Sequence, residues 1–337
     1  MNPHLADTDP LMPGTDETLI PPHRAAPRSP WVDIGLILTD YPPATHVYEQ
    51  LLHETELLHG TGHASACFFI HKPPGLRWRL SAMADMPLSE LREAAVAAAA
   101  RVVGPDRVRS AVYEPQEVLF GGSRSMHFVH RTWSADSRLW MRWHAARGGR
   151  ATSGERWELS FRVLARVYAA LGVVGWEDRE VWDRVCRDTG RRLTEHAWAR
   201  PEVVSLARAL QERWGDAWGT PARGPGPERD GLRASLVDEF ARTGDDLFRA
   251  WHRECLSLPR THHPLSPRQA AAYWTVFHWN RAGFSAGQQA LTAEALSVLP
   301  LDTTGLDDTG LDGTGLDGTG LDGTGLDGTD QDKPAGP

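Results

Sequence analysis

The sequence predicts an α+β fold, with strands mainly in the first half of the chain and a helix-rich second half. Short aliphatic runs bounded by proline and glycine occupy the early part of the chain, which is typical of strands. From Trp157 onward, apolar residues recur at helical spacing. With 337 residues, of which 41% are hydrophobic and 24% charged, the chain has the composition of a globular protein.

The ordered part is expected to begin at Trp31, close to the first aliphatic run. A Pro-Pro-Gly segment ending at Gly75 separates two further runs and predicts a turn between strands. An alanine-rich stretch suits a helix that packs closely on a sheet. In this half we expect strands at 33–39, 66–70 and 76–80, and helices at 51–58 and 87–103.

The second half is expected to consist of helices. Leu159, Val163, Val167 and Leu171 mark one helical face, which ends at Gly172. Further helices are expected at 176–199, 202–215, 231–242, 244–257, 266–282 and 286–298. A proline-rich loop is expected at 219–230.

Both ends of the chain differ from its body, which we place at 31–300 as one catalytic domain. Residues 1–30 are proline-rich and polar, which predicts a disordered arm. Residues 301–337 contain nine Asp and one Lys, and 304–328 repeat the pattern Thr-Gly-Leu-Asp-Gly. One leucine in five residues buries too little for a packed repeat, so we expect a solvated acidic tail that is dispensable for folding and turnover.

Charge and cysteine usage limit the possible partners. The tail accounts for the whole net charge of −8, so the body is formally neutral and gives no electrostatic reason to bind nucleic acid. Three widely spaced cysteines, Cys67, Cys186 and Cys255, favour a reducing cytoplasm. We find no signal peptide and no run of apolar residues long enough for a membrane span, so a cytoplasmic protein without membrane attachment is expected.

Common cofactor motifs are absent from the sequence. It has no phosphate-binding glycine loop and no dinucleotide fingerprint. The pairs His59/His63 and His127/His130 have spacings that a metal can use, but neither has a third ligand nearby in sequence. We therefore expect no metal and no cofactor.

Three segments combine glycine, arginine and aromatic residues in orders that packing does not require. They are 68–79, 113–122 and 273–281. Arg77 and Arg79 alternate along a strand and should share a face, either as an ion-pair lattice or as a clamp on an oxyanion. Fourteen tryptophans, among them Trp182, Trp214 and Trp251, are expected in the core or in a groove suited to a large peptide.

In this order, the three segments resemble the elimination domain of lantibiotic dehydratases, which also occurs as the free-standing thiopeptide-type bacteriocin biosynthesis family. The start at Trp31-Val-Asp-Ile resembles the start of that family. Residues 68–79 resemble its Phe-Phe-Ile-Arg-Tyr…Arg-x-Arg signature, 113–122 resemble Tyr-x-Pro-Glu-x-x-Arg-Tyr-Gly-Gly, and 276–281 resemble a histidine-containing helix that ends in Asn-Arg. The resemblance covers about residues 31–298 and implies the fold of that domain.

The departures from the family pattern concern its glutamate-handling residues. Leu119 stands where the resemblance implies an arginine that binds the glutamate expelled from a glutamylated Ser or Thr. Gln116 replaces an acid and His71 replaces an arginine. This combination resembles the thiopeptide pyridine synthases, which join two dehydroalanines by a formal aza-[4+2] cycloaddition and then release water and the leader peptide.

That branch implies a site that moves protons and positions a peptide. We expect Tyr273 and His278 to perform acid–base work, with Ser266 and Ser285 as hydrogen-bond partners. The expected substrate-binding residues are Arg77, Arg79, Tyr113, Asn280 and Arg281. The expected partners are a modified precursor peptide with its leader and other enzymes of the same pathway.

Two alternatives remain open. The first is a glutamate-eliminating lyase of a split dehydratase that has moved its arginine, with Arg124 as the candidate. The second is a non-catalytic subunit that binds the peptide and presents it to an enzyme.

Overall fold

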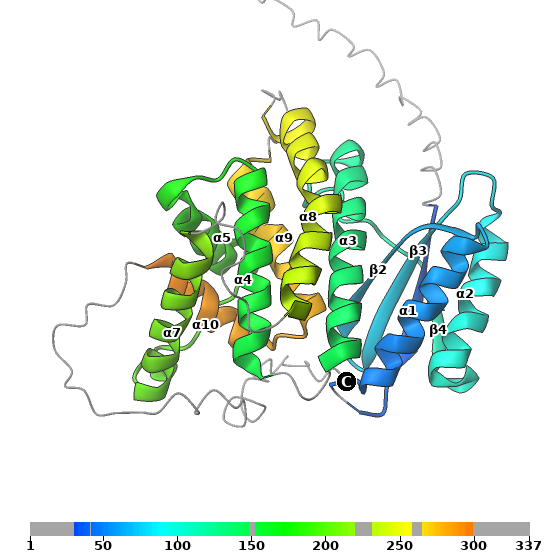
Figure 1. Ribbon diagram of the computed structural model, residues 1–337, viewed down its shortest axis with the longest axis horizontal. Coiled ribbons are helices and arrows are strands. Elements are labelled where there is room, and N and C mark those ends of the chain that lie inside the picture. The colour runs from blue at the N-terminus through cyan, green and yellow to red at the C-terminus, as the bar shows by residue number, and fades with distance from the viewer. Residues whose placement is uncertain (1–29, 41, 148–151, 220–230, 258–264, 299–337) are drawn as a thin grey trace, which may run out of the picture.

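A small antiparallel sheet stands at one end of the molecule, and helices make up the rest (Figure 1). The computed structural model describes residues 30–40, 42–147, 152–219, 231–257 and 265–298. The predicted arm before Pro30, the acidic tail and most of the 219–230 loop lie outside these residues. The predicted α+β class, with its strands in the first half, is confirmed.

The sheet has four strands in the order β2-β3-β1-β4, and all neighbouring pairs are antiparallel. The strands are β1 (Trp31–Ile37), β2 (Ala64–Lys72), β3 (Gly75–Ala82) and β4 (Val108–Ala111). Gly75 enters β3 so close to β1 that an added Cβ would lie 1.9 Å from the carbonyl oxygen of Leu36, so only glycine fits there.

The register divides the side chains of the sheet into two faces. Asp33 on β1 lies opposite Arg79 on β3, and Arg79 in turn lies opposite Phe68 on β2. Because side chains alternate along a strand, Asp33, Arg77 and Arg79 share one face with Phe68, while Ile34 and Trp78 lie on the other. The prediction that Arg77 and Arg79 share a face is confirmed.

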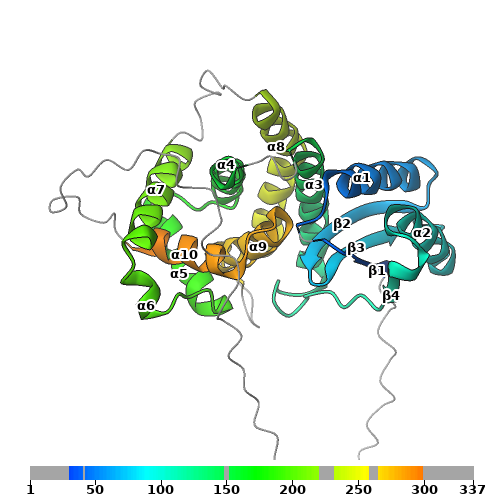
Figure 2. The ribbon, with the colours of Figure 1, turned by 90° about the horizontal axis from the view of Figure 1, so that it is seen from below.

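Different helices cover the two faces. The face of Trp78 packs on α1 (Thr45–Gly60) and α2 (Leu88–Val103). The arginine face meets α3 (Ser123–Arg147) and α9 (Pro267–Ala282), which join the sheet to the helical part (Figure 2). The core is continuous across this junction and contains the fully buried Trp133 and Trp279.

The helices of the helical part are α4 (Ser153–Ala170), α5 (Asp178–Thr189), α6 (Glu195–Trp198), α7 (Pro201–Trp218), α8 (Gly231–Trp251) and α10 (Ala286–Ser297). In this part, α9 packs on α3, α4 and α5. Three short turns complete the described elements: η1 (Pro105–Arg107), η3 (Gly175–Glu177) and the π-helical η4 (His252–Leu256).

Several helix predictions require correction. The single helix expected at 176–199 ends at Thr189, because Gly190 has a φ of 69° and leaves the helical conformation. The two helices expected at 231–242 and 244–257 form one continuous helix, α8, which passes through Gly244. Neither α3 nor β4 was predicted.

In the described parts of the chain, no single helix is both long and apolar enough to cross a membrane. One pair, Ser153–Ala170 with Gly175–Thr189, passes such a test together, with a bend of 118° between its members.

Candidate functional site

Helix α9 brings the third sequence segment to the junction of the sheet and the helical part. It begins with Ser266, whose hydroxyl accepts a hydrogen bond from the backbone N–H of Gln269, and with Pro267 in the first turn. It ends at Gly283, whose φ of 75° suits glycine. Between these ends the helix presents three fully buried polar side chains, Thr275, His278 and Arg281.

Four side chains form a chain of hydrogen bonds that we call the buried network: Ser160, His278, Asp136 and Arg281. The Ser160 hydroxyl lies 3.0 Å from Nε2 of His278, and Nδ1 of His278 lies 2.8 Å from Oδ1 of Asp136. The other carboxylate oxygen of Asp136 accepts a hydrogen bond of 3.1 Å from Arg281. Each of these four residues has a relative exposure of 0%.

The proton positions in the buried network follow from the chemistry of its groups. The Asp136 carboxylate only accepts hydrogen bonds, so Nδ1 of His278 carries a proton and donates it to Asp136. Nε1 of Trp140 also approaches Nδ1, at 3.3 Å, and the Ser160 hydroxyl meets the other ring nitrogen, Nε2. The order Ser–His–Asp resembles that of a nucleophilic triad, but full burial closes this serine to a substrate.

Arg281 is a buried cation with bonding capacity to spare. Burial lowers its pKa to about 10, although Asp136 acts in the opposite direction, so the guanidinium stays charged at neutral pH. It lies 5.2 Å from the centre of the Trp133 ring. Its Nε and Nη2 atoms have no hydrogen-bond partner among the described residues. Unpaired N–H groups on a buried cation favour an oxygen ligand, such as a carbonyl or a carboxylate.

A second group, the arginine–tyrosine cluster, consists of Asp33, Arg79, Tyr113 and His130. Arg79 donates a hydrogen bond of 3.1 Å to Asp33 and lies 4.9 Å above the ring of Tyr113. The Tyr113 hydroxyl is 2.7 Å from Nε2 of His130. The cluster joins β1 and β3, the segment after β4, and α3.

The tyrosine and histidine of this cluster are both uncharged at neutral pH. Burial, assisted by Arg79 and His127, lowers the pKa of His130 to about 3. Burial also raises the pKa of Tyr113 well above its usual value, although Arg79 acts in the opposite direction. The hydrogen bond between the Tyr113 hydroxyl and Nε2 of His130 therefore joins two neutral groups.

Tyr273 lies outside both groups, on another side of α9. Its position five residues before His278 places the two side chains on different helical faces. The ring of Tyr273 meets Phe120 edge to face, and its hydroxyl accepts a hydrogen bond of 3.0 Å from the Gln269 amide. The side chain is half-buried, so its hydroxyl hydrogen remains available to a bound molecule.

The remaining predicted site residues have local structural contacts. Ser266 and Ser285 cap the N-termini of α9 and α10. Asn280 accepts a hydrogen bond from Gln289. Arg77 lies 3.9 Å from Asp33, so both strand arginines belong to the ion-pair arrangement that was one of their two expected roles.

Sequence reasoning missed Asp136 and Ser160, and considered His130 only as a metal ligand. Asp136 and His130 belong to α3, which was not predicted. No motif marks either Asp136 or Ser160, and only the fold brings them to His278.

The histidine pairs and tryptophans of the sequence have other surroundings. Within the described residues, no three His, Cys, Asp or Glu side chains gather closely enough to hold a metal ion. His63 contacts Thr61, and His130 contacts Tyr113. Trp182, Trp214 and Trp251 are buried, which agrees with the core position among their two expected roles.

The fold and the proximity of the three segments agree with a domain related to the elimination domains of lantibiotic dehydratases. Residues 39–299 match the family described as "Lantibiotic biosynthesis dehydratase C-term". The chain belongs to this lantibiotic dehydratase C-terminal family. No curated protein matches the sequence.

Two solved structures share the fold at low sequence identity. The tRNA-dependent lantibiotic dehydratase MibB from Microbispora sp. 107891 is 17% identical, with a TM-score of 0.52 over 80% of this chain and 28% of MibB. The chain thus spans less than a third of MibB. The protein TsrL is 14% identical, with a TM-score of 0.51 over 79% of this chain and 93% of TsrL.

Proposed function

We propose that this protein forms a pyridine ring within a thiopeptide-type precursor, by joining two dehydroalanines and then releasing water and the leader peptide. The observation that carries the proposal is Leu119. The resemblance places a glutamate-binding arginine at this position, and here a half-buried leucine packs against the apolar core. A leucine cannot pair with a departing carboxylate.

The proposed reaction needs proton transfer and positioning. One backbone amide must become its imidic acid tautomer before the ring closes, and aromatisation then needs an acid to assist the leaving groups. Tyr273 is our candidate for this acid, because Gln269 donates to its oxygen and leaves its own hydrogen free. Holding two distant alkenes together provides the rest of the acceleration.

In this proposal, Arg281 is a positioning residue as well, because it is as fully buried as Ser160, and its charge acts on the reaction without direct contact with the substrate. His278 and Asp136 act on the reaction through Arg281, because both are fully buried and Asp136 bonds to each of the other two. They are therefore positioning residues. Arg79 contributes a second cation on the sheet side of the site.

Glutamate elimination remains the second candidate, because the chain belongs to the family of elimination domains. Arg124, the candidate for a relocated glutamate-binding arginine, lies exposed at the start of α3 and pairs with Glu254 at 3.1 Å. Because Arg124 is exposed, water would surround an ion pair between it and the carboxylate of the departing glutamate. Such an ion pair would be weak.

The deciding experiment compares two substrates by mass spectrometry. One is an azole-containing peptide with two dehydroalanines and a leader, and the other is a glutamylated peptide. We expect a macrocycle and a leader carboxamide from the first and no glutamate release from the second. Leu119→Arg should not create elimination activity, because it places a charge against the apolar core. Glutamate release without any macrocycle would overturn the proposal, and no mass change with either substrate would favour a peptide-binding subunit.

A further inference from the structure

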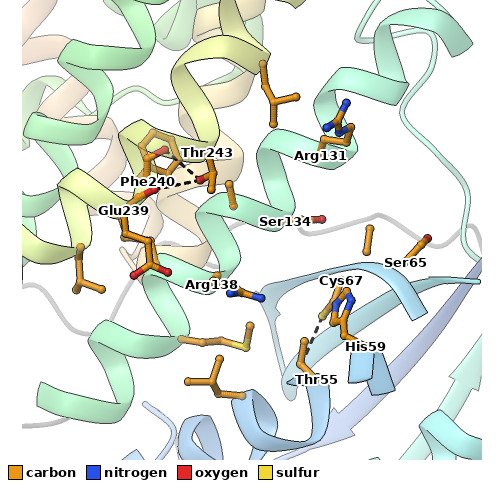
Figure 3. A pocket seen from close by; sticks show the side chains of 17 residues that line it. Thr55, His59, Ser65, Cys67, Arg131, Ser134, Arg138, Glu239, Phe240 and Thr243 are labelled. Atoms are coloured by element: carbon orange, nitrogen blue, oxygen red, sulfur yellow. Dashed lines mark hydrogen bonds between the residues drawn. The ribbon is translucent and has the colours of Figure 1, made fainter. Parts of the chain in front are cut away.

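A pocket of about 460 Å³ lies between α1, β2, α3 and α8, and none of its lining residues belongs to the buried network or the arginine–tyrosine cluster. Figure 3 shows Arg131, Ser134 and Arg138 following one another along the side of α3 that borders it. Trp133 and Asp136 belong to the nearly opposite side of the same helix, because the helix turns by about 100° per residue. The pocket is therefore separate from the buried network.

The charge of the pocket is positive. Arg131 and Arg138 line it with exposed side chains, and no carboxylate of the described residues pairs with either one. The carboxylate that lines it, Glu239, is already bound to Arg142. His59 adds no charge at neutral pH, because burial and then Arg138 lower its pKa.

The shape and the other walls suit an extended peptide. Strand β2 is at the edge of the sheet, and α3 closes that edge where the Phe69 N–H donates to Ser137. Further along the strand the edge borders the pocket at Ser65, which is exposed, and at Ala66. Apolar side chains form much of the remaining wall: Leu52, Leu139, Leu236, Phe240 and Leu247.

We propose that this pocket binds an acidic, extended segment of the precursor peptide, outside the residues that react. Carboxylates of the segment pair with Arg131 and Arg138, its backbone follows the edge of β2, and alternate apolar side chains enter the wall. The two arginines are two helical turns apart, about 10 Å along the axis. That distance lies between the spans of two and four residues of an extended chain, so carboxylates at alternate positions, which share one face, can reach both long arginine side chains. The inference rests on the proposal that the substrate is a peptide.

Binding is tested on the full-length protein with a fluorescent eight-residue peptide, acetyl-Asp-Leu-Asp-Thr-Asp-Leu-Asp-Thr-amide, by fluorescence anisotropy. The counterpart peptide has Asn in place of each Asp. We expect the Asp peptide to bind and the Asn peptide to bind at least about tenfold more weakly. The double variant Arg131→Ala/Arg138→Ala should bind the Asp peptide more weakly by the same factor. Both side chains are exposed, so the variant should fold, and Arg92→Ala, exposed on α2 outside the pocket, is the matched control.

Three results would overturn the inference: equal binding of the two peptides, equal loss in the control variant, or displacement of the peptide by inorganic phosphate at the same concentration. The last result would mean a site for small anions only. Turnover separates this failure from failure of the proposed function. With a precursor peptide that carries an acidic leader, the double variant should raise KM and leave kcat unchanged. If the double variant forms the macrocycle with the KM of the original protein, the proposed function stands and the proposed role of the pocket is refuted.

Discussion

Asp136 is a single carboxylate that two other buried groups depend on. It fixes the proton of His278 on Nδ1 and provides the one hydrogen-bonded counter-charge of Arg281 among the described residues. All three side chains lie in the interior, where an uncompensated charge is far less stable than in water. The orientation of Arg281 is therefore set by Asp136.

Replacing Asp136 by Asn should lower the free energy of unfolding by about 3–5 kcal/mol, because it leaves the Arg281 cation buried beside a neutral amide. Urea unfolding measures the change. The control is Asp183→Asn, which breaks an exposed pair with Arg187 and should change stability by less than about 1 kcal/mol. Equal effects in both variants would mean that Arg281 does not need the charge of Asp136.

Tyr273→Phe should reduce kcat by about 100- to 10,000-fold while peptide binding stays normal, because it removes a proton donor and keeps the ring that meets Phe120. The matched variant is Tyr168→Phe, which removes a buried hydroxyl bonded to Thr275 and should affect stability instead of turnover. Turnover by the Tyr273→Phe protein at the normal rate would remove Tyr273 from the mechanism.

At the scale of helices and strands, patterns were informative where one face of an element is buried. Polar and apolar residues alternate clearly along β3, and so the shared face of Arg77 and Arg79 was predicted. Helix α3 gave no such pattern, because it is buried against the sheet on one side and against α8 and α9 on others. Its buried residues include Thr132, Asp136 and Ser137, which interrupt any apolar stripe.

Two helix boundaries near glycines were predicted wrongly: one predicted break is absent, and one break was not predicted. The break predicted between 242 and 244 is absent, because α8 continues through Gly244, which lies between Phe240 and Phe248. Gly190 ends α5 in the left-handed region, where the predicted helix continued. Local sequence does not distinguish the two glycines, because each one suits either the interior or the end of a helix. The fold places Gly190 at a helix end with a positive φ and Gly244 within a helix.

The cap serines allow a test of the roles expected for them. Ser266→Ala and Ser285→Ala should each lower stability by about 1 kcal/mol, because each hydroxyl accepts a backbone N–H in the first turn of a helix. Thermal unfolding and steady-state turnover should be measured together. A large loss of kcat with unchanged stability would support the hydrogen-bonding role in catalysis that the sequence suggested.

At the scale of the whole molecule, buried histidines should make the fold sensitive to acid. Burial lowers the pKa of His144 to about 4, whereas an unfolded chain has a histidine pKa of about 6.5. Between these values the unfolded state binds a proton that the folded state does not. The stabilisation is therefore complete above pH 6.5 and is lost as the pH falls towards 4. His130 acts in the same direction.

We expect the free energy of unfolding to decrease by up to about 1.4 kcal/mol per pH unit for each such histidine between pH 6.5 and pH 4. Urea unfolding at several pH values measures the slope. His144→Gln keeps a donor for the carbonyl oxygen of Arg281 and should flatten the slope. A variant with the slope of the original protein would show that His144 does not supply this sensitivity.

The burial of α3 limits which substitutions this helix can accept during evolution. Thirteen of its 25 residues are buried, and its two sides serve the buried network and the pocket. The thirteen buried positions can therefore accept few other side chains without disturbing a neighbour on one side of the helix or the other. In a saturation mutagenesis experiment, substitutions at these thirteen buried positions should be tolerated less often than substitutions at the other positions of α3.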